Sequence, residues 1–224
     1  MRPLDTAYMG DLVPVILGYV PLTLGMALAA MAAALVLAAL LAIVRVLRLP
    51  VADQIVAVFI SFFRGTPLLV QLFLFYYGLP QLVPAMTSID GITAAVIGLT
   101  LHFSAYMAES IRGAILGVDR SQWEAAQSIG MTQGQLLRRI VLPQASRVAA
   151  PTLMNYFIDL IKSTSLAFTL GVTEMMGAAQ KEAAGSFLYL EAFLVVALIY
   201  WIMVEVLSVG QRWMERHLGK AVAR

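Results

Sequence analysis

The sequence places polar and ionisable side chains inside stretches that are otherwise apolar enough to cross a membrane. The segment SFFRGTPLLVQLFLFYYGLP, residues 61–80, carries Arg64, Gly65, Thr66 and Pro67 in succession. A charged arginine at the centre of a spanning helix costs about 2.5–3.5 kcal/mol on insertion scales. Broken backbone at membrane depth is tolerated only where protein buries it or where it lines a cavity. We therefore expect this segment to face other protein or a water-filled path.

Thr66 and Pro67 have the chemistry of a helix start inside the membrane. A threonine hydroxyl can cap the free N–H groups of a first turn, and proline is preferred at the first helical position. A half-helix that restarts at Pro67 would present partial positive charge and N–H donors to an anionic group. Gln71 lies four residues further along, on about the same helix face. We predict that Thr66, Pro67 and Gln71 border a translocation path; the alternative is a structural kink held through Arg64.

A second polar group lies on a later apolar segment. Asn155, Asp159 and Lys162 follow one another at four- and three-residue spacing, so they share one helix face. Ionisable groups at membrane depth rarely face lipid and are functional candidates by default. Two alternatives stay open for this group, because Asp159 and Lys162 could pair with each other or meet the two charged ends of a zwitterionic substrate.

The remaining ionisable groups have simpler interpretations. In the kink alternative, Arg64 is anchored to an acidic neighbour such as Glu109 or Asp159. Glu109 and Arg112 are three residues apart and predict an ion pair on a helix surface. His102 is interpreted as a hydrogen-bonded packing residue. With two distant histidines and no cysteine, the sequence predicts no metal site.

The composition is that of an integral membrane protein. Of 224 residues, 61% are hydrophobic and 12% charged, against about 45–50% and about 25% in soluble domains. The first apolar run, residues 12–44, exceeds the roughly 7–15 residues of a signal-peptide core. Since a spanning helix needs about 20 apolar residues, we predict an all-α, polytopic protein in one domain, 1–224. An interfacial lead-in over residues 1–20 precedes five expected spans, at about 22–44, 54–79, 92–111, 148–169 and 189–210.

The basic residues indicate how the chain is oriented. The loops on one side collect eleven lysines and arginines, against two on the other side. Cytoplasmic loops are enriched in these residues, so we expect the N-terminus outside the cytoplasmic membrane and the C-terminus inside. The eleven inner residues are Arg45, Arg48, Arg112, Arg120, Arg138, Arg139, Arg147, Arg212, Arg216, Lys220 and Arg224; the outer two are Arg2 and Lys181.

The longest polar loop, 112–147, then lies in the cytoplasm and reads EAAQSIGMTQGQLLRRIVLPQA over residues 124–145. Apolar residues recur at helical spacing on either side of Gly130, which predicts two short amphipathic helices joined by a glycine turn. Such a pair could dock into a groove on another protein. It could equally lie on the membrane surface or cover the helix bundle.

These residues carry a family resemblance. Glu124, Ala125 and Ala126, followed at fixed spacing by Gly130, Ile140, Leu142 and Pro143, resemble the complete EAA motif of ABC importer permeases. The stretches FFRGTPLLVQLFLFYYGLP, AYMAESIRGAI and KSTSLA resemble the polar amino-acid permease group, so nearly the whole chain is covered. Within that group, QWEAAQSIGMT, YYGLPQ and LIYWIM are most similar to the bacterial cystine permease; the glutamine, glutamate and arginine permeases are near relatives.

The resemblance implies a type I ABC importer permease fold in the bacterial inner membrane. It also implies a second permease subunit, identical or not, two ATPase subunits that bind ATP and Mg, and an extracytoplasmic solute-binding protein. Residues 121–143 would be the coupling region seated on the ATPase. No G-x-x-x-x-G-K-[ST] phosphate loop occurs in this chain, so another chain must bind the nucleotide. The substrate-path residues would then receive the carboxylate of a polar amino acid, with cystine favoured.

Other functions fit less well. A proton-coupled or other secondary transporter could use Asp159, Lys162 and Glu109 as a charge relay, but no inverted repeat is visible. A membrane-embedded enzyme would need a nucleophile and base that converge, and the sequence offers no such pattern. The basic tail fits anionic lipid headgroups, and no alternation of aromatic and basic residues points to nucleic acid.

Overall fold

The protein is described here from a computed structural model that covers residues 3–222, with side chains through Arg216. The side chains of Arg2, Lys220 and Arg224, which entered the charge count, therefore lie outside the described part. The described residues form helices and connecting turns and contain no strand. The α-helices are α1 (Thr6–Leu17), α2 (Val20–Leu47), α3 (Ala52–Gly65), α4 (Leu68–Phe73), α5 (Leu79–Leu82), α6 (Gly91–Leu116), α7 (Arg120–Ser128), α8 (Gln133–Leu136), α9 (Leu142–Ser163), α10 (Met175–Ser186) and α11 (Tyr189–Val222).

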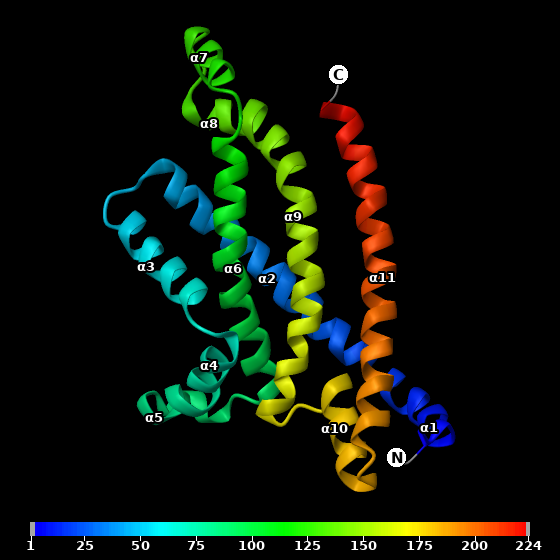
Figure 1. Ribbon diagram of the computed structural model, residues 1–224. Coiled ribbons are helices and arrows are strands. Elements are labelled where there is room, and N and C mark those ends of the chain that lie inside the picture. The colour runs from blue at the N-terminus through cyan, green and yellow to red at the C-terminus, as the bar shows by residue number, and fades with distance from the viewer. Residues whose placement is uncertain (1–2, 223–224) are drawn as a thin grey trace.

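Short π- and 3-10 segments complete the chain. A π segment, Leu74–Gly78, joins α4 to α5, and another, Leu137–Val141, joins α8 to α9. Pro84–Ser88 and Thr164–Leu170 are 3-10 helices. Figure 1 shows α7 and α8 at one end of the molecule and α1 and α10 at the other, with α6, α9 and α11 running between the two ends.

The centre of the bundle is the crossing of α2 and α6. Five alanines of α2 repeat at three- and four-residue spacing, and each of them is fully buried: Ala27, Ala30, Ala34, Ala38 and Ala42. Small side chains allow helix backbones to approach closely in a membrane protein. Leu99, Ala105 and Ala108 of α6 belong to the same core cluster. This contact fixes the bundle on which the polar groups are mounted.

The expected spans are recognisable, with shifted ends. Within residues 3–222, three helices are long and apolar enough to cross a membrane: 20–47, 91–116 and 189–216. The pair 52–65 and 68–82 qualifies as a fourth span if its bent halves are counted together. α9 is 22 residues long but includes Arg147, Asp159 and Lys162, which lower its hydropathy. The all-α fold is confirmed, while the count of five spans stays a prediction.

The predicted second span is broken much more sharply than a kink. The helix axis bends by 111° between its two halves, across residues 66 and 67. Thr66 adopts an extended backbone at the C-terminal end of α3, and Pro67, also extended, is the N-cap of α4. Figure 1 shows α3 running toward α6 and α4 lying beside the lower part of α6 after this joint. The helix therefore restarts at Leu68, one residue later than expected.

The end of the bundle opposite α7 contains a buried, hydrogen-bonded carboxyl group that the sequence did not predict. Glu174 is fully buried at the N-cap of α10, where its Oε1 accepts from the N–H of Gly177 at 2.9 Å. Its Oε2 accepts from the hydroxyl of Tyr200 on α11 at 3.0 Å and from that of Thr23 on α2 at 3.5 Å. One carboxyl group thus connects α10 to the next helix, α11, and to Thr23 of α2, which lies 151 residues away in sequence.

Candidate functional site: the α7–α8 segment, the broken span and the polar face of α9

Local hydrogen bonding defines the turn between α7 and α8. Asp119 begins α7 by accepting from the N–H of Ser121 at 2.8 Å, and this bond lowers the pKa of its carboxyl group. Gly130 has a φ of 76°, in the left-handed region that glycine adopts without strain. Thr132 and Gln135 then form a reciprocal capping box at the start of α8. The predicted helix–turn–helix and its glycine are confirmed.

One face of this segment is anchored to the bundle. Ala126 of α7, Leu136 of α8 and Val141 of the π segment are buried together with Ile115 and Val118 at the end of α6. The alternative in which the two helices cover the bundle is thus correct for this face. Because the π segment runs directly into α9, the α7–α8 segment is tied to both α6 and α9.

The other face of the segment is exposed. Glu124 and Ala125 point outward, while Ala126, the third residue of the motif, points inward. Ile129 is at helical spacing from Trp123 and Ala126, which predicts that it lies on the apolar side of the helix. It instead has 77% of its surface exposed beside Gly130. Ile140 is half-buried, and Leu142 and Pro143 are exposed at the start of α9. The motif residues therefore divide between an anchored face and a free face.

Glu124 is held only weakly within the chain. Its carboxylate pairs with Arg120 one helical turn earlier at 3.2 Å, and both side chains are mostly exposed. Exposed pairs of this kind contribute about 0.3–0.5 kcal/mol. The Glu124 carboxylate can thus exchange Arg120 for a polar group on another protein at little cost.

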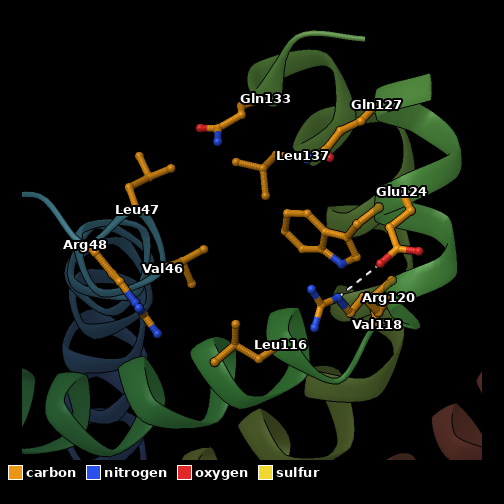
Figure 2. Close-up of a pocket in the computed structure, with 11 residues that line it drawn as sticks. Val46, Leu47, Arg48, Leu116, Val118, Arg120, Glu124, Gln127, Gln133 and Leu137 are labelled. Carbon is orange, nitrogen blue, oxygen red and sulfur yellow. Dashed lines mark ion pairs between the residues drawn. The ribbon is translucent and has the colours of Figure 1, made fainter. Parts of the chain in front are cut away.

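The side of α7 that faces the end of α2 borders a cavity of about 580 Å³, and Glu124, although exposed, lines it. Figure 2 shows Val46, Leu47 and Arg48 at the end of α2 on one side of it and Arg120 and Glu124 on the other. Leu116, the last residue of α6, lies between the two sides. Two long apolar helices therefore end at this cavity.

At the broken span, Gln71 is used entirely within the chain. Its amide nitrogen donates to the carbonyl of Phe63 at 3.0 Å, to the carbonyl of Thr66 at 3.1 Å and to the hydroxyl of Thr66 at 2.8 Å. Its Oε1 lies 3.0 Å from Nδ1 of His102 on α6, and only 1% of the residue is exposed. Gln71 thus satisfies carbonyls that the end of α3 leaves free, and His102 is hydrogen-bonded as expected.

Thr66 and Arg64 differ from expectation. The prediction that Thr66 caps the second half-helix is wrong, because its hydroxyl donates backwards to the carbonyl of Phe62 at 2.8 Å and α4 has no side-chain cap. Within the described chain Arg64 pairs with neither Glu109 nor Asp159. Its guanidinium instead lies 5.5 Å from the ring centroid of Tyr106. Thr66 is half-buried and Pro67 exposed, so both remain accessible beside the joint.

The acidic side chain proposed as an anchor for Arg64 is otherwise engaged. Glu109 binds Arg112 at 2.6 Å, as the three-residue spacing predicted, and lies 3.9 Å from Arg45 of α2. Arg45 in turn pairs with Asp53 at the start of α3 at 2.8 Å. These ion pairs join α2, α3 and α6 near the end of the bundle that carries α7.

The polar residues of α9 form an exposed row. Asp159 and Lys162 pair with each other at 2.7 Å, so the self-pairing alternative describes the chain as it stands; each side chain is 53% exposed. Asn155 accepts from Gln211 of α11 at 3.0 Å. This row and the joint at Thr66 lie on different helices, and within the described residues no hydrogen bond or ion pair joins the two groups.

Sequence reasoning missed Glu174 and Gln211. Glu174 lies between the fourth and fifth expected spans, where an acidic residue attracts no notice, and only the folded arrangement of α2, α10 and α11 reveals its burial. Gln211 lay just beyond the expected end of the fifth span. A polar residue there could have been paired with Asn155 only if the packing of α11 on α9 had been known.

Comparison with known proteins places the chain among transport components. The family described as "Binding-protein-dependent transport system inner membrane component" matches residues 30–220. A probable amino-acid ABC transporter permease protein of Vibrio harveyi, PatM, is 61% identical, with 98% of this chain and 99% of the relative covered. The L-cystine transport system permease protein TcyL of Bacillus subtilis is 37% identical, with 100% and 95% covered.

A solved structure is similar over nearly the whole chain. The crystal structure of an amino acid ABC transporter with histidines superposes with a TM-score of 0.89 at 30% identity, covering 96% of this chain and all of that one.

Proposed function

We propose that this chain imports cystine or a closely related polar amino acid. The premise is that it belongs to the family of binding-protein-dependent transport system inner membrane components and is a permease subunit of an amino-acid ABC transporter. The cystine assignment is supported by the 37% identity to TcyL over the whole chain. A secondary transporter is not favoured, because the relatives are permeases of ABC transporters.

The proposed partners are a second permease subunit, two ATPase subunits and an extracytoplasmic solute-binding protein. ATP and Mg would be bound by the ATPase subunits, since this chain has no phosphate loop. The chain would lie in the bacterial inner membrane with its N-terminus outside and with α7, α8 and the C-terminus in the cytoplasm. The basic residues of the loops support this orientation.

Coupling is proposed to act through the free face of the α7–α8 segment. This is the single observation that carries the mechanism: one face of the segment is buried on α6 and α9, while Glu124, Ala125 and Ile129 are exposed. A closing ATPase pair that binds the free face would move the segment, and the buried face would pass this movement to both helices. Nucleotide would shift the permease between states only as far as the ATPase contacts favour one state.

The substrate path is proposed to follow the polar face of α9. Asn155, Asp159 and Lys162 are exposed on this face, and such groups are costly against lipid. We therefore place this face toward water or the second permease subunit. Breaking the Asp159–Lys162 pair would offer one charge to each end of an amino acid. Thr66 and Pro67 would border the path, and Gln71 would hold the joint that positions them.

Reconstitution in proteoliposomes tests the substrate. The permease, its ATPase subunits and its solute-binding protein are combined, and ATP hydrolysis and solute uptake are measured with cystine, glutamine, glutamate and arginine. We expect cystine to stimulate hydrolysis and to accumulate in the vesicles. Stimulation by one of the other amino acids, with no response to cystine, would contradict the cystine assignment.

A pair of variants tests the coupling face. Ile129 and Leu82 are both exposed, by 77% and 81%, but lie on different ends of the bundle. Ile129→Glu should reduce copurification of the ATPase subunits, because it adds a charge to the proposed contact, whereas Leu82→Glu should leave copurification unchanged. Equal retention of the ATPase by both variants would place the contact elsewhere.

A further inference from the structure

The cavity between the end of α2 and α7 has a mixed lining, which shares Glu124 with the coupling face. Its volume is about 580 Å³. Leu47 and Leu116 contribute exposed apolar surface, at 39% and 57% exposed. Val118 and Trp123 also line it, and Arg48 and Arg120 contribute positive charge. Apolar surface beside two cations is the lining expected for an amphiphile with an anionic head.

The position of the cavity matches the border of the hydrocarbon layer. Leu47 is the last residue of the long apolar helix α2, and Leu116 is the last residue of α6. Two long apolar helices that end at the same level mark where lipid headgroups begin. Tryptophan is enriched at this level of membrane proteins, and Trp123 lines the cavity. The cavity therefore opens where a phosphate headgroup would lie.

Arg48 is available to bind a ligand. It is exposed and makes no ion pair or side-chain hydrogen bond within the described chain. Figure 2 shows its side chain extending from the end of α2, across the cavity from Arg120. Arg120 is paired only with Glu124, in an exposed ion pair. A phosphate could therefore replace the Glu124 carboxylate as the partner of Arg120. A guanidinium binds phosphate with two parallel hydrogen bonds.

We propose that this cavity binds the headgroup of an anionic phospholipid from the leaflet on the α7 side, with its phosphate between Arg48 and Arg120. The acyl chains would extend along Leu47 and Leu116 into the bilayer. Basic pockets between spanning helices are a known way to recognise such headgroups. A bound lipid would thereby lie against the side of α7 that faces the end of α2 and fill the space between the two helices.

The test uses the intact transporter with its partner subunits, stripped of lipid and then titrated with phosphatidylglycerol or phosphatidylcholine. Native mass spectrometry counts the lipids bound. We expect phosphatidylglycerol to be preferred and Arg48→Gln to weaken its binding roughly fivefold, the effect of one basic residue near an anionic surface. Arg48→Lys should retain most of the binding. Leu116→Asn, which keeps every charge, should also weaken it.

Arg212 provides the matched control, because it is an exposed arginine on the same side of the bundle but does not line the cavity. Because Arg212 belongs to the basic tail, Arg212→Gln should weaken the binding less than Arg48→Gln does. Equal losses from Arg48→Gln and Arg212→Gln would overturn the proposal, as would equal binding of the two lipids. Displacement by inorganic phosphate at similar concentration would assign the cavity to a free anion. If lipid binds only after the ATPase subunits are removed, the cavity is occupied by the ATPase in the intact transporter, and the proposal is overturned.

Discussion

Alanine at position 130 should uncouple the transporter without disturbing the bundle. Gly130 has a φ of 76°, and a Cβ built on it meets no atom within 4 Å. The added methyl group therefore causes no clash, and the whole cost is conformational. An L-residue in the left-handed region pays about 1–2 kcal/mol. If the turn relaxes to avoid this strain, the geometry presented to the ATPase is populated about fivefold to thirtyfold less.

Gly134 is a control of the same chemistry four residues away. It is exposed, its φ lies outside the left-handed region, and a Cβ there also meets nothing within 4 Å. Because it lies in α8, Gly134→Ala should favour the helix by up to about 0.5–1 kcal/mol. The two substitutions add the same methyl group to the same segment, with opposite expected signs.

The assay is the affinity of purified ATPase subunits for the permease in nanodiscs, measured alongside the thermal unfolding temperature of the permease. Gly130→Ala should bind the ATPase about fivefold to thirtyfold more weakly, in line with the strain. Gly134→Ala should bind as well as the unaltered chain or better. The reasoning is refuted if both variants bind equally, or if Gly134→Ala is the weaker of the two.

Three further substitutions probe the joint, the helix crossing and the start of α7. Gln71→Leu leaves buried carbonyls unpaired and should cost about 1–3 kcal/mol of stability, seen as a lower unfolding temperature than for Gln81→Leu at an exposed site. Gly98→Ala places a methyl group 2.5 Å from a buried leucine side chain of α4 and should cost about 1–3 kcal/mol. Gly113→Ala, with open space around it in the same helix, should instead stabilise the chain by up to about 0.5–1 kcal/mol. Because the pKa of Asp119 is lowered in the folded chain, its cap is fully present above the unfolded pKa and is lost as pH falls through the folded one. The protection factor of the α7 amides, which corrects for the pH dependence of intrinsic exchange, should therefore fall in acid, and Asp119→Asn should remove that fall. A protection factor that still falls in acid in this variant would contradict the assignment.

The sequence was informative where a local rule governs the outcome. The left-handed turn at Gly130, the break beside Pro67 and the pairing of Glu109 with Arg112 depend on residues a few positions apart. Each could be inferred from backbone preferences or helical spacing, and each is present. The shared face of Asn155, Asp159 and Lys162 on α9 follows from spacing in the same way, although their exposure does not.

Contacts between distant segments could not be inferred in this way. The 111° angle at the joint depends on how α4 meets α6, where Gln71 binds His102. The sequence alone is equally consistent with a Gln71 side chain that faces outward, and only the contact with His102 decides between the two orientations. Glu174 is buried only because α2 and α11 converge on it. The exposure of Ile129 likewise depends on which side of α7 packs on α6.

The regular spacing of Ala30, Ala34, Ala38 and Ala42 along α2 has a mechanical consequence. Each of these residues is fully buried, and successive members are separated by four residues, or about 6 Å along the axis. Sliding α2 by that interval would set most of these alanines where a neighbour had been, but it would break the contacts of Thr23 with Glu174 and of Arg45 with Asp53. Shear between packed helices is one of the ways in which proteins switch between global states. The alanine seam thus offers little steric resistance to such a shear, and the polar contacts at the two ends of α2 oppose it.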